Sequence, residues 1–265
     1  MNTYPFASQN RRIGINSRFF KPAVAKACST MSCVQKRWQA KLGDSAKSST
    51  YQQPSAPVLP PTEQSTSLRQ QALTEAQQGN HTKAIVLFSH LIDRNPSNAN
   101  DYSNRGLVYF QSGQAEAALA DYNRAIELNP RLDSAYNNRA NYYAAQGQFL
   151  EAILDYDVAL DLNPINVRAW INQAITFREL EMFDRAIESL ELALGLGKLE
   201  GHIYAERGRT YHLRGDWNCA VADYQRALVL LPESSALPKN PSVRLRAQVE
   251  RWLNNLIGNQ TSTNF

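Results

Sequence analysis

The amino-acid sequence repeats itself with a period of 34 residues, and this period limits what the chain can fold into. The dipeptide Asn-Pro recurs at this spacing and ends at Pro96, Pro130 and Pro164. Two further steps of the same length lead to Pro232. Counted back from these prolines, the chain divides into five units: 65–98, 99–132, 133–166, 167–200 and 201–234. A fixed period of this length predicts an array of stacked supersecondary units.

The same kinds of residue recur at the same positions of each unit. Position 20 is always alanine, position 8 is alanine or glycine, and positions 4, 11 and 24 are mostly aromatic. Apolar residues at positions 4, 8 and 11, and again at 20, 24 and 27, follow helical spacing in two separate runs. Glycine at position 15 suits a left-handed residue that ends the first helix, and proline near position 32 ends the second. Each unit is therefore expected to be a helical hairpin that stacks on its neighbours.

Two units depart from this pattern. Unit 1 lacks the aromatic residues at positions 4 and 11, which suits a terminal unit. Unit 4 has Glu181 in place of the glycine, and Gly195-Leu196-Gly197-Lys198 in place of the Asn-Pro ending. This junction between units 4 and 5 is interpreted either as a bend or loosened turn, or as drift without consequence.

A further helix is predicted beyond the last unit, over residues 241–257. Asn240 can cap its N-terminus and Pro241 can occupy its first turn. The apolar residues that follow share one face: Leu245, Val249, Trp252, Leu253 and Leu256. This pattern favours a helix that caps unit 5, with an amphipathic membrane helix as the weaker alternative.

These columns resemble the tetratricopeptide-repeat (TPR) family, in the style of its bacterial and plastid members, over about 170 of the 265 residues. The resemblance implies an all-α fold, namely a right-handed superhelical solenoid of five helix-turn-helix repeats with a C-terminal capping helix. It also implies a non-enzymatic scaffold that binds another protein, with assembly of a larger complex as an expected role. The expected domains are a basic leader and linker over 1–62, the repeat domain over 63–258 and a disordered tail over 259–265.

In this family the first helices line a concave groove, and positions 2, 5, 6, 9 and 12 usually face the ligand. Position 6 is asparagine in three successive units, at Asn104, Asn138 and Asn172. An asparagine side chain offers both donors and an acceptor. We call these three residues the asparagine ladder and expect it to bind the backbone of an extended peptide. The alternative is that asparagine is merely a soluble residue that an exposed helical site tolerates.

Three more residues at groove positions are candidates for ligand contact: Asn141, Arg168 and Arg178. Arginine can form two parallel hydrogen bonds with a carboxylate. The later half of the groove is therefore expected to accept an acidic segment or a chain terminus.

A second set of charged residues is assigned to the scaffold rather than to a ligand. Wherever position 7 is arginine, position 23 is aspartate, and where position 7 is glutamine the acid is absent. This joint variation predicts salt bridges between the two helices of one unit. The predicted pairs are Arg105–Asp121, Arg139–Asp155 and Arg207–Asp223.

Charge is distributed unevenly along the chain. Residues 1–62 contain nine lysines or arginines and one acid, whereas the remaining residues contain 19 basic and 23 acidic side chains. The Ser-, Gln- and Pro-rich stretch 48–61 is typical of a flexible linker. Before it, residues 22–42 have the spacing of a basic amphipathic helix. Three interpretations stay open for the leader: a disordered or partly helical tail, an organellar transit peptide, or a helix that contacts a membrane surface or nucleic acid.

Other functional classes receive little support. Three cysteines without matching spacing predict neither a disulfide framework nor a metal site, and no cofactor is expected. The four histidines are spread over units 1 and 5, and phosphate-binding glycine loops and nucleophile motifs are absent. Nucleic-acid binding by the repeats is disfavoured because they are net acidic. No apolar run is long enough to cross a bilayer. A bacterial cytoplasmic location is expected, or an organelle if residues 1–60 are a transit peptide.

Overall fold

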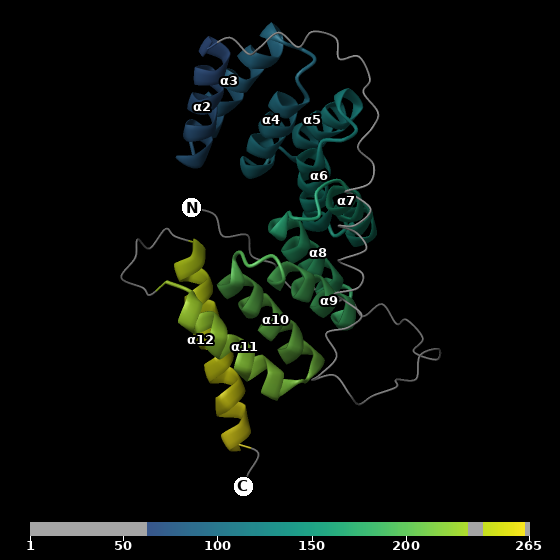
Figure 1. The fold of residues 1–265 in the computed structure, drawn as a ribbon. Coiled ribbons are helices and arrows are strands. Elements are labelled where there is room, and N and C mark those ends of the chain that lie inside the picture. The colour runs from purple at the N-terminus through teal and green to yellow at the C-terminus, as the bar shows by residue number, and fades with distance from the viewer. Residues whose placement is uncertain (1–62, 233–240, 263–265) are drawn as a thin grey trace.

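The repeat predicted from the sequence is present as an unbroken series of helical hairpins in a computed structural model, which describes residues 63–232 and 241–262 (Figure 1). The leader 1–62 and residues 233–240 and 263–265 lie outside the described part of the chain. The helices are α2 (Glu63–Gln77), α3 (His81–Arg94), α4 (Ala99–Gln111), α5 (Ala115–Leu128), α6 (Asp133–Ala145), α7 (Phe149–Leu162), α8 (Val167–Glu179), α9 (Phe183–Leu194), α10 (Glu200–Arg214), α11 (Trp217–Leu230) and α12 (Pro241–Ser262). Consecutive helices from α2 to α11 pair into the five predicted units, and α12 follows as a single helix.

Each hairpin turns at the position that glycine occupies in four of the units. Gly79, Gly113, Gly147 and Gly215 have φ between 75° and 93°, the left-handed region that glycine adopts without steric cost. At the turn of unit 2, the N–H of Gln114 donates to the carbonyl oxygen of Tyr109 at 2.8 Å. Such bonds satisfy carbonyl groups that the end of the helix leaves open.

Unit 4 makes the same turn without glycine. Glu181 has φ 57°, and the N–H of Met182 donates to the carbonyl oxygen of Phe177 at 2.9 Å, as in the other units. The turn between α8 and α9 is therefore the same as the turns of the other units. The change lies further along, where φ is positive at Gly197 (63°) and Leu199 (56°) and α10 begins at Glu200. That start is one position earlier in the repeat than the starts of α4, α6 and α8.

The core is formed where the small residues at positions 8 and 20 pack against the large residue at position 24. The alanine at position 20 is fully buried in every unit, and the residue at position 24 is at most 1% exposed in every unit. Position 8 must be small for a measurable reason. A Cβ atom on Gly106 would lie 2.8 Å from the ring of Tyr122, and one on Gly208 would lie 2.8 Å from the ring of Tyr224.

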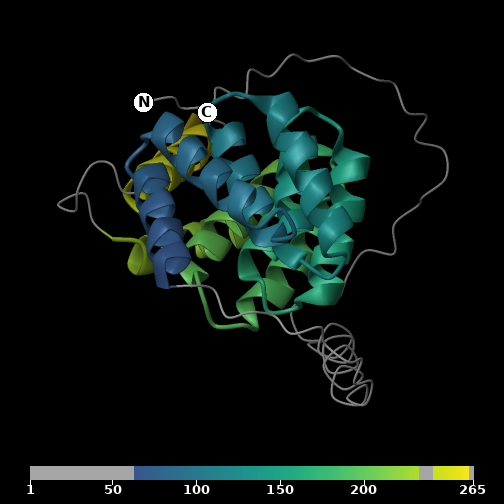
Figure 2. The same cartoon turned by 90° about the horizontal axis from the view of Figure 1, so that it is seen from above.

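The hairpins wind around an axis, as the view from above shows (Figure 2). From α4 onwards the first helices of successive units contact one another, since α4 packs against α6, α6 against α8, α8 against α10 and α10 against α12. The second helices make no comparable contacts with one another within the described residues. The first helices therefore lie on the inner face of the array and the second helices on its outer face.

Helix α12 covers the exposed end of unit 5. It packs against α10 and α11, with Val249 and Leu256 buried and the ring of Trp252 centred 5.9 Å from that of Tyr224. The helix extends past its predicted end at residue 257 to Ser262. Within the described residues no helix combines the length and apolarity that crossing a membrane requires.

Candidate functional site

The asparagine ladder lies on three neighbouring helices of the inner face. Asn104, Asn138 and Asn172 come from α4, α6 and α8, and all three are partly buried. Their equal position in the repeat places them in register along the array, because each unit repeats the geometry of the last. The three carboxamides therefore occupy equivalent places on successive first helices.

Part of this row is linked from unit to unit. Asn138 Nδ2 donates to Ser103 Oγ at 3.3 Å, and Asn172 Nδ2 donates to Asn141 Oδ1 at 2.9 Å. Asn141 also accepts a hydrogen bond of 2.6 Å from the hydroxyl of Tyr156. Asn141 thus holds the side chain of Asn172 in place. Each bond uses one N–H of the donor amide, and an asparagine side chain has a second N–H and a carbonyl oxygen to offer.

The two candidate arginines differ in their surroundings. Arg178 Nη1 forms an ion pair with Glu206 Oε2 at 2.7 Å, across the junction of units 4 and 5. The guanidinium group of Arg178, which was predicted to contact a ligand, is therefore already bound to Glu206. Arg168 is exposed at the start of α8. The inner face therefore keeps a polar, nearly neutral row of amides, with Arg168 as its exposed cation in unit 4.

A second ion pair between units was not predicted from the sequence. Arg69 of α2 donates two hydrogen bonds, of 2.6 and 2.8 Å, to the carboxylate of Asp101 of α4, which is fully buried. This pair lies between the first helices of units 1 and 2. None of the other units has an arginine at the position of Arg69, so comparing equivalent positions of the units could not predict this ion pair.

The structure places the three arginine–aspartate pairs together. Nε–Oδ2 distances are 2.8 Å for Arg105–Asp121, 2.7 Å for Arg139–Asp155 and 2.6 Å for Arg207–Asp223, and each pair has a second, parallel bond. The aspartates are at most 7% exposed. Hydrogen bonding to Asp121 raises the pKa of Arg105 above its usual value, and Asp155 acts likewise on the pKa of Arg139. These guanidinium groups face the scaffold, not a ligand.

All three of these arginines also reach the preceding unit. Arg105 donates to Ser89 Oγ at 3.0 Å and Arg139 to Asn123 Oδ1 at 2.8 Å, both at position 25. Arg207 Nη1 lies 3.8 Å from Glu191 Oε1, at the same position of unit 4. In unit 4 positions 7 and 23 are the neutral residues Gln173 and Ser189. Gln173 donates to Oδ1 of Asp157, at position 25 of unit 3, at 2.8 Å and accepts from Ser189 Oγ at 3.0 Å. The residue at position 25 therefore connects its unit to the next one. The sequence comparison considered only positions 7 and 23 and did not predict this contact.

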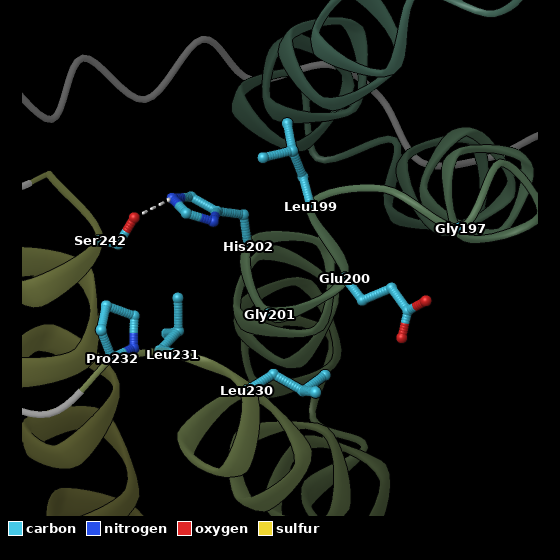
Figure 3. A pocket seen from close by; sticks show the side chains of 9 residues that line it. All are labelled: Gly197, Leu199, Glu200, Gly201, His202, Leu230, Leu231, Pro232 and Ser242. Carbon is cyan, nitrogen blue, oxygen red and sulfur yellow. Dashed lines mark hydrogen bonds between the residues drawn. The ribbon is translucent and has the colours of Figure 1, made fainter.

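A separate cleft of about 420 Å³ lies at the junction of units 4 and 5, next to the start of α12 (Figure 3). His202 Nε2 lies 3.4 Å from Ser242 Oγ at its wall, and burial lowers the pKa of His202. No cluster of three or more His, Cys, Asp or Glu side chains within 63–232 and 241–262 is placed to hold a metal ion. None of the three ladder asparagines lines the cleft, so the cleft is a feature distinct from the ladder.

Comparison with known sequences identifies the repeat. A TPR repeat model matches residues 106–147, and tetratricopeptide repeat models match residues 134–166 and 167–196. The last two matches keep the register of units 3 and 4. No curated protein sequence matches the chain at a significant level.

Solved structures share the fold at low sequence identity. TTC0263, a thermophilic TPR protein in Thermus thermophilus, is 20% identical with a TM-score of 0.59, and the alignment covers 71% of this chain and 98% of TTC0263. The crystal structure of MamA is 20% identical with a TM-score of 0.52, covering 63% of this chain and 91% of MamA. At this identity the likeness is one of fold alone.

Proposed function

The chain belongs to the tetratricopeptide-repeat family, whose members are generally non-enzymatic scaffolds for protein–protein interaction, and we propose that it binds an extended segment of a partner protein along its inner face. The observation that carries this proposal is the asparagine ladder, three carboxamides in register on α4, α6 and α8. An extended peptide offers N–H and C=O groups along its whole length. A row of amides can pair with both kinds of group and so bind with little regard to sequence.

Two arginines of the inner face are already paired, which leaves Arg168 as the exposed cation of that face in unit 4. Arg69 and Arg178 are already paired with Asp101 and Glu206, so neither is free to clamp an incoming carboxylate. Breaking either pair would leave a largely buried acid without its partner, which costs several kcal/mol. The ladder remains as the main source of polar contact. Escort or assembly of a larger complex is the role that such binding would serve.

The test compares the ladder with matched asparagines elsewhere. Peptides are selected on the wild-type chain from a random library, and their affinity is measured by fluorescence anisotropy. Replacing Asn104, Asn138 and Asn172 by alanine should weaken binding about 10- to 2,000-fold, because three hydrogen bonds of about 0.5–1.5 kcal/mol each are lost. The control replaces Asn218, Asn254 and Asn255, which are exposed on α11 and α12.

The control variant should bind as the wild type does, and circular dichroism should show both variants to be folded. Equal affinity in the ladder variant would contradict the proposal. So would a wild-type chain that selects no peptide, or peptides whose binding depends on acidic residues alone.

A further inference from the structure

An apolar stripe runs along the outer face of the third unit. Leu150, Leu154 and Val158 follow one another at four-residue steps on α7 and are 67%, 66% and 38% exposed. Residues at this spacing share one face of a helix. Among the described helices α7 packs mainly against α6 and α8, and the exposure of Leu150 and Leu154 shows that the described chain leaves most of the stripe uncovered. We call these three residues the outer stripe.

The charged residues of α7 itself are all acidic. Helix α7 contains four acids and is the only second helix without a lysine or arginine, since α3, α5, α9 and α11 each have at least one. Asp155 is paired with Arg139, while Glu151, Asp157 and Asp161 are exposed. At 100° per residue, Asp157 borders the stripe on one side and Glu151 on the other.

An apolar face bordered by acidic residues is complementary to a helix whose apolar face is bordered by basic residues. The leader contains such a sequence over residues 22–42, which has no acid and whose basic residues are Lys26, Lys36, Arg37 and Lys41. Its apolar residues recur at three- and four-residue steps: Val24, Cys28, Met31, Val34, Trp38 and Leu42. We propose that residues 22–42 of the same chain dock as an amphipathic helix on the outer stripe of α7.

The linker is long enough for this contact. Twenty residues separate the end of the segment at 42 from α2, and an extended chain of that length spans at most about 70 Å. Five helix-to-helix steps lead from α2 to α7, and at about 10 Å each they amount to at most about 50 Å. A tethered segment is present at an effective concentration on the order of millimolar, which favours docking within one chain over docking between copies.

Charge complementarity selects this surface among the outer helices. The only large exposed apolar residue on α3 is Val86, and α3 also carries Lys83 and Arg94, which would repel a basic segment. On α11 the exposed apolar residues lie at its two ends, beside Arg226 in the case of Val229. Docking on α7 leaves the inner face open, so it is independent of the proposed peptide binding.

Zero-length carbodiimide cross-linking of the full chain tests the proposal, because it joins only a lysine and a carboxylate that touch. In the monomer fraction, peptide mass spectrometry should find Lys26, Lys36 or Lys41 joined to Glu151 or Asp157. The double change Leu150→Gln and Leu154→Gln should reduce these products at least fivefold, as should Met31→Gln with Trp38→Gln in the leader. The matched control is Val86→Gln, at the same repeat position as Leu154, and it should leave them unchanged.

Four outcomes would overturn the proposal. The first is cross-links of equal yield in the Leu150 and Leu154 variant. The second is leader lysines that join acids of α5 or α9 as often as those of α7. The third is products that join only differently isotope-labelled copies. The fourth is a leader that binds anionic vesicles while giving no product with α7.

Discussion

Three tyrosines hold the same position in units 2, 3 and 5, yet their hydroxyl groups have different partners. Tyr156 donates to Asn141, and the hydroxyl of Tyr224 lies 3.2 Å from His212 Nδ1. The hydroxyl of Tyr122 is buried and has no hydrogen-bond partner within the described chain. Burial raises the pKa of Tyr224 to about 12 and the pKa of Tyr122 above its usual value. Burial of the Tyr122 hydroxyl therefore has a desolvation cost without compensation. The hydroxyl of Tyr156 has the same cost, but its hydrogen bond to Asn141 offsets it.

Removing the two hydroxyl groups should give opposite results. Tyr122→Phe is expected to leave stability unchanged or raise it by up to about 1 kcal/mol, because an unsatisfied buried group is removed. Tyr156→Phe should lower stability by about 1–2 kcal/mol, since the bond to Asn141 is lost. Urea denaturation of the full chain measures both. Equal losses in the two variants would contradict this account.

Residues that vary together within a unit could be predicted from the sequence, and contacts between units could not. The pairing of Arg139 with Asp155 follows from two columns that change in step. The contact of Arg139 with Asn123 does not, because position 25 is Ser89 in one unit and Asn123 in the next. The pair of Arg178 and Glu206 depends on how two first helices approach each other, and periodicity does not reveal that distance.

At the scale of the element, the turn of unit 4 shows hydrogen bonding overriding residue preference. Glu181 has the left-handed conformation that glycine has in the other units, and the N–H of Met182 makes the same bond as its counterparts. A non-glycine residue in this region costs roughly 1–2 kcal/mol. The sequence indicated the departure but could not show that the turn persists, because a glutamate is not expected to adopt the left-handed conformation.

Exchanging the turn residues should therefore move stability in both directions. Glu181→Gly is expected to raise the free energy of unfolding by about 0.5–1 kcal/mol, since relief of strain exceeds the added freedom of the unfolded chain. Gly147→Glu should lower it by a similar amount. A Cβ at Gly147 would have no atom within 4 Å, so that cost belongs to the backbone alone. Thermal unfolding of both variants provides the check, and a destabilised Glu181→Gly variant would refute the strain.

At the scale of the whole molecule, the array is held together by neighbour contacts, and its C-terminal end depends on α12. Each unit packs only on the units beside it, so loss of one contact should open the chain locally. Val249 of α12 is fully buried in a cluster with Ala205 and Tyr224 of unit 5. The far end of the array, at α2 and α3, has no contact with this cluster.

A charge placed in that cluster should uncap unit 5 and leave the first units intact. Val249→Asp would bury an unpaired carboxylate at a cost of several kcal/mol, and detaching α12 relieves it. Amide hydrogen exchange should then accelerate at least tenfold in α10, α11 and α12, with α4 and α5 unchanged. Ile257→Asp places the same charge on the same helix where the side chain is 47% exposed, and it should behave as the wild type does. Equal acceleration from α4 to α11 in the Val249→Asp variant would mean that the array unfolds as one cooperative unit, which the sequential contacts argue against.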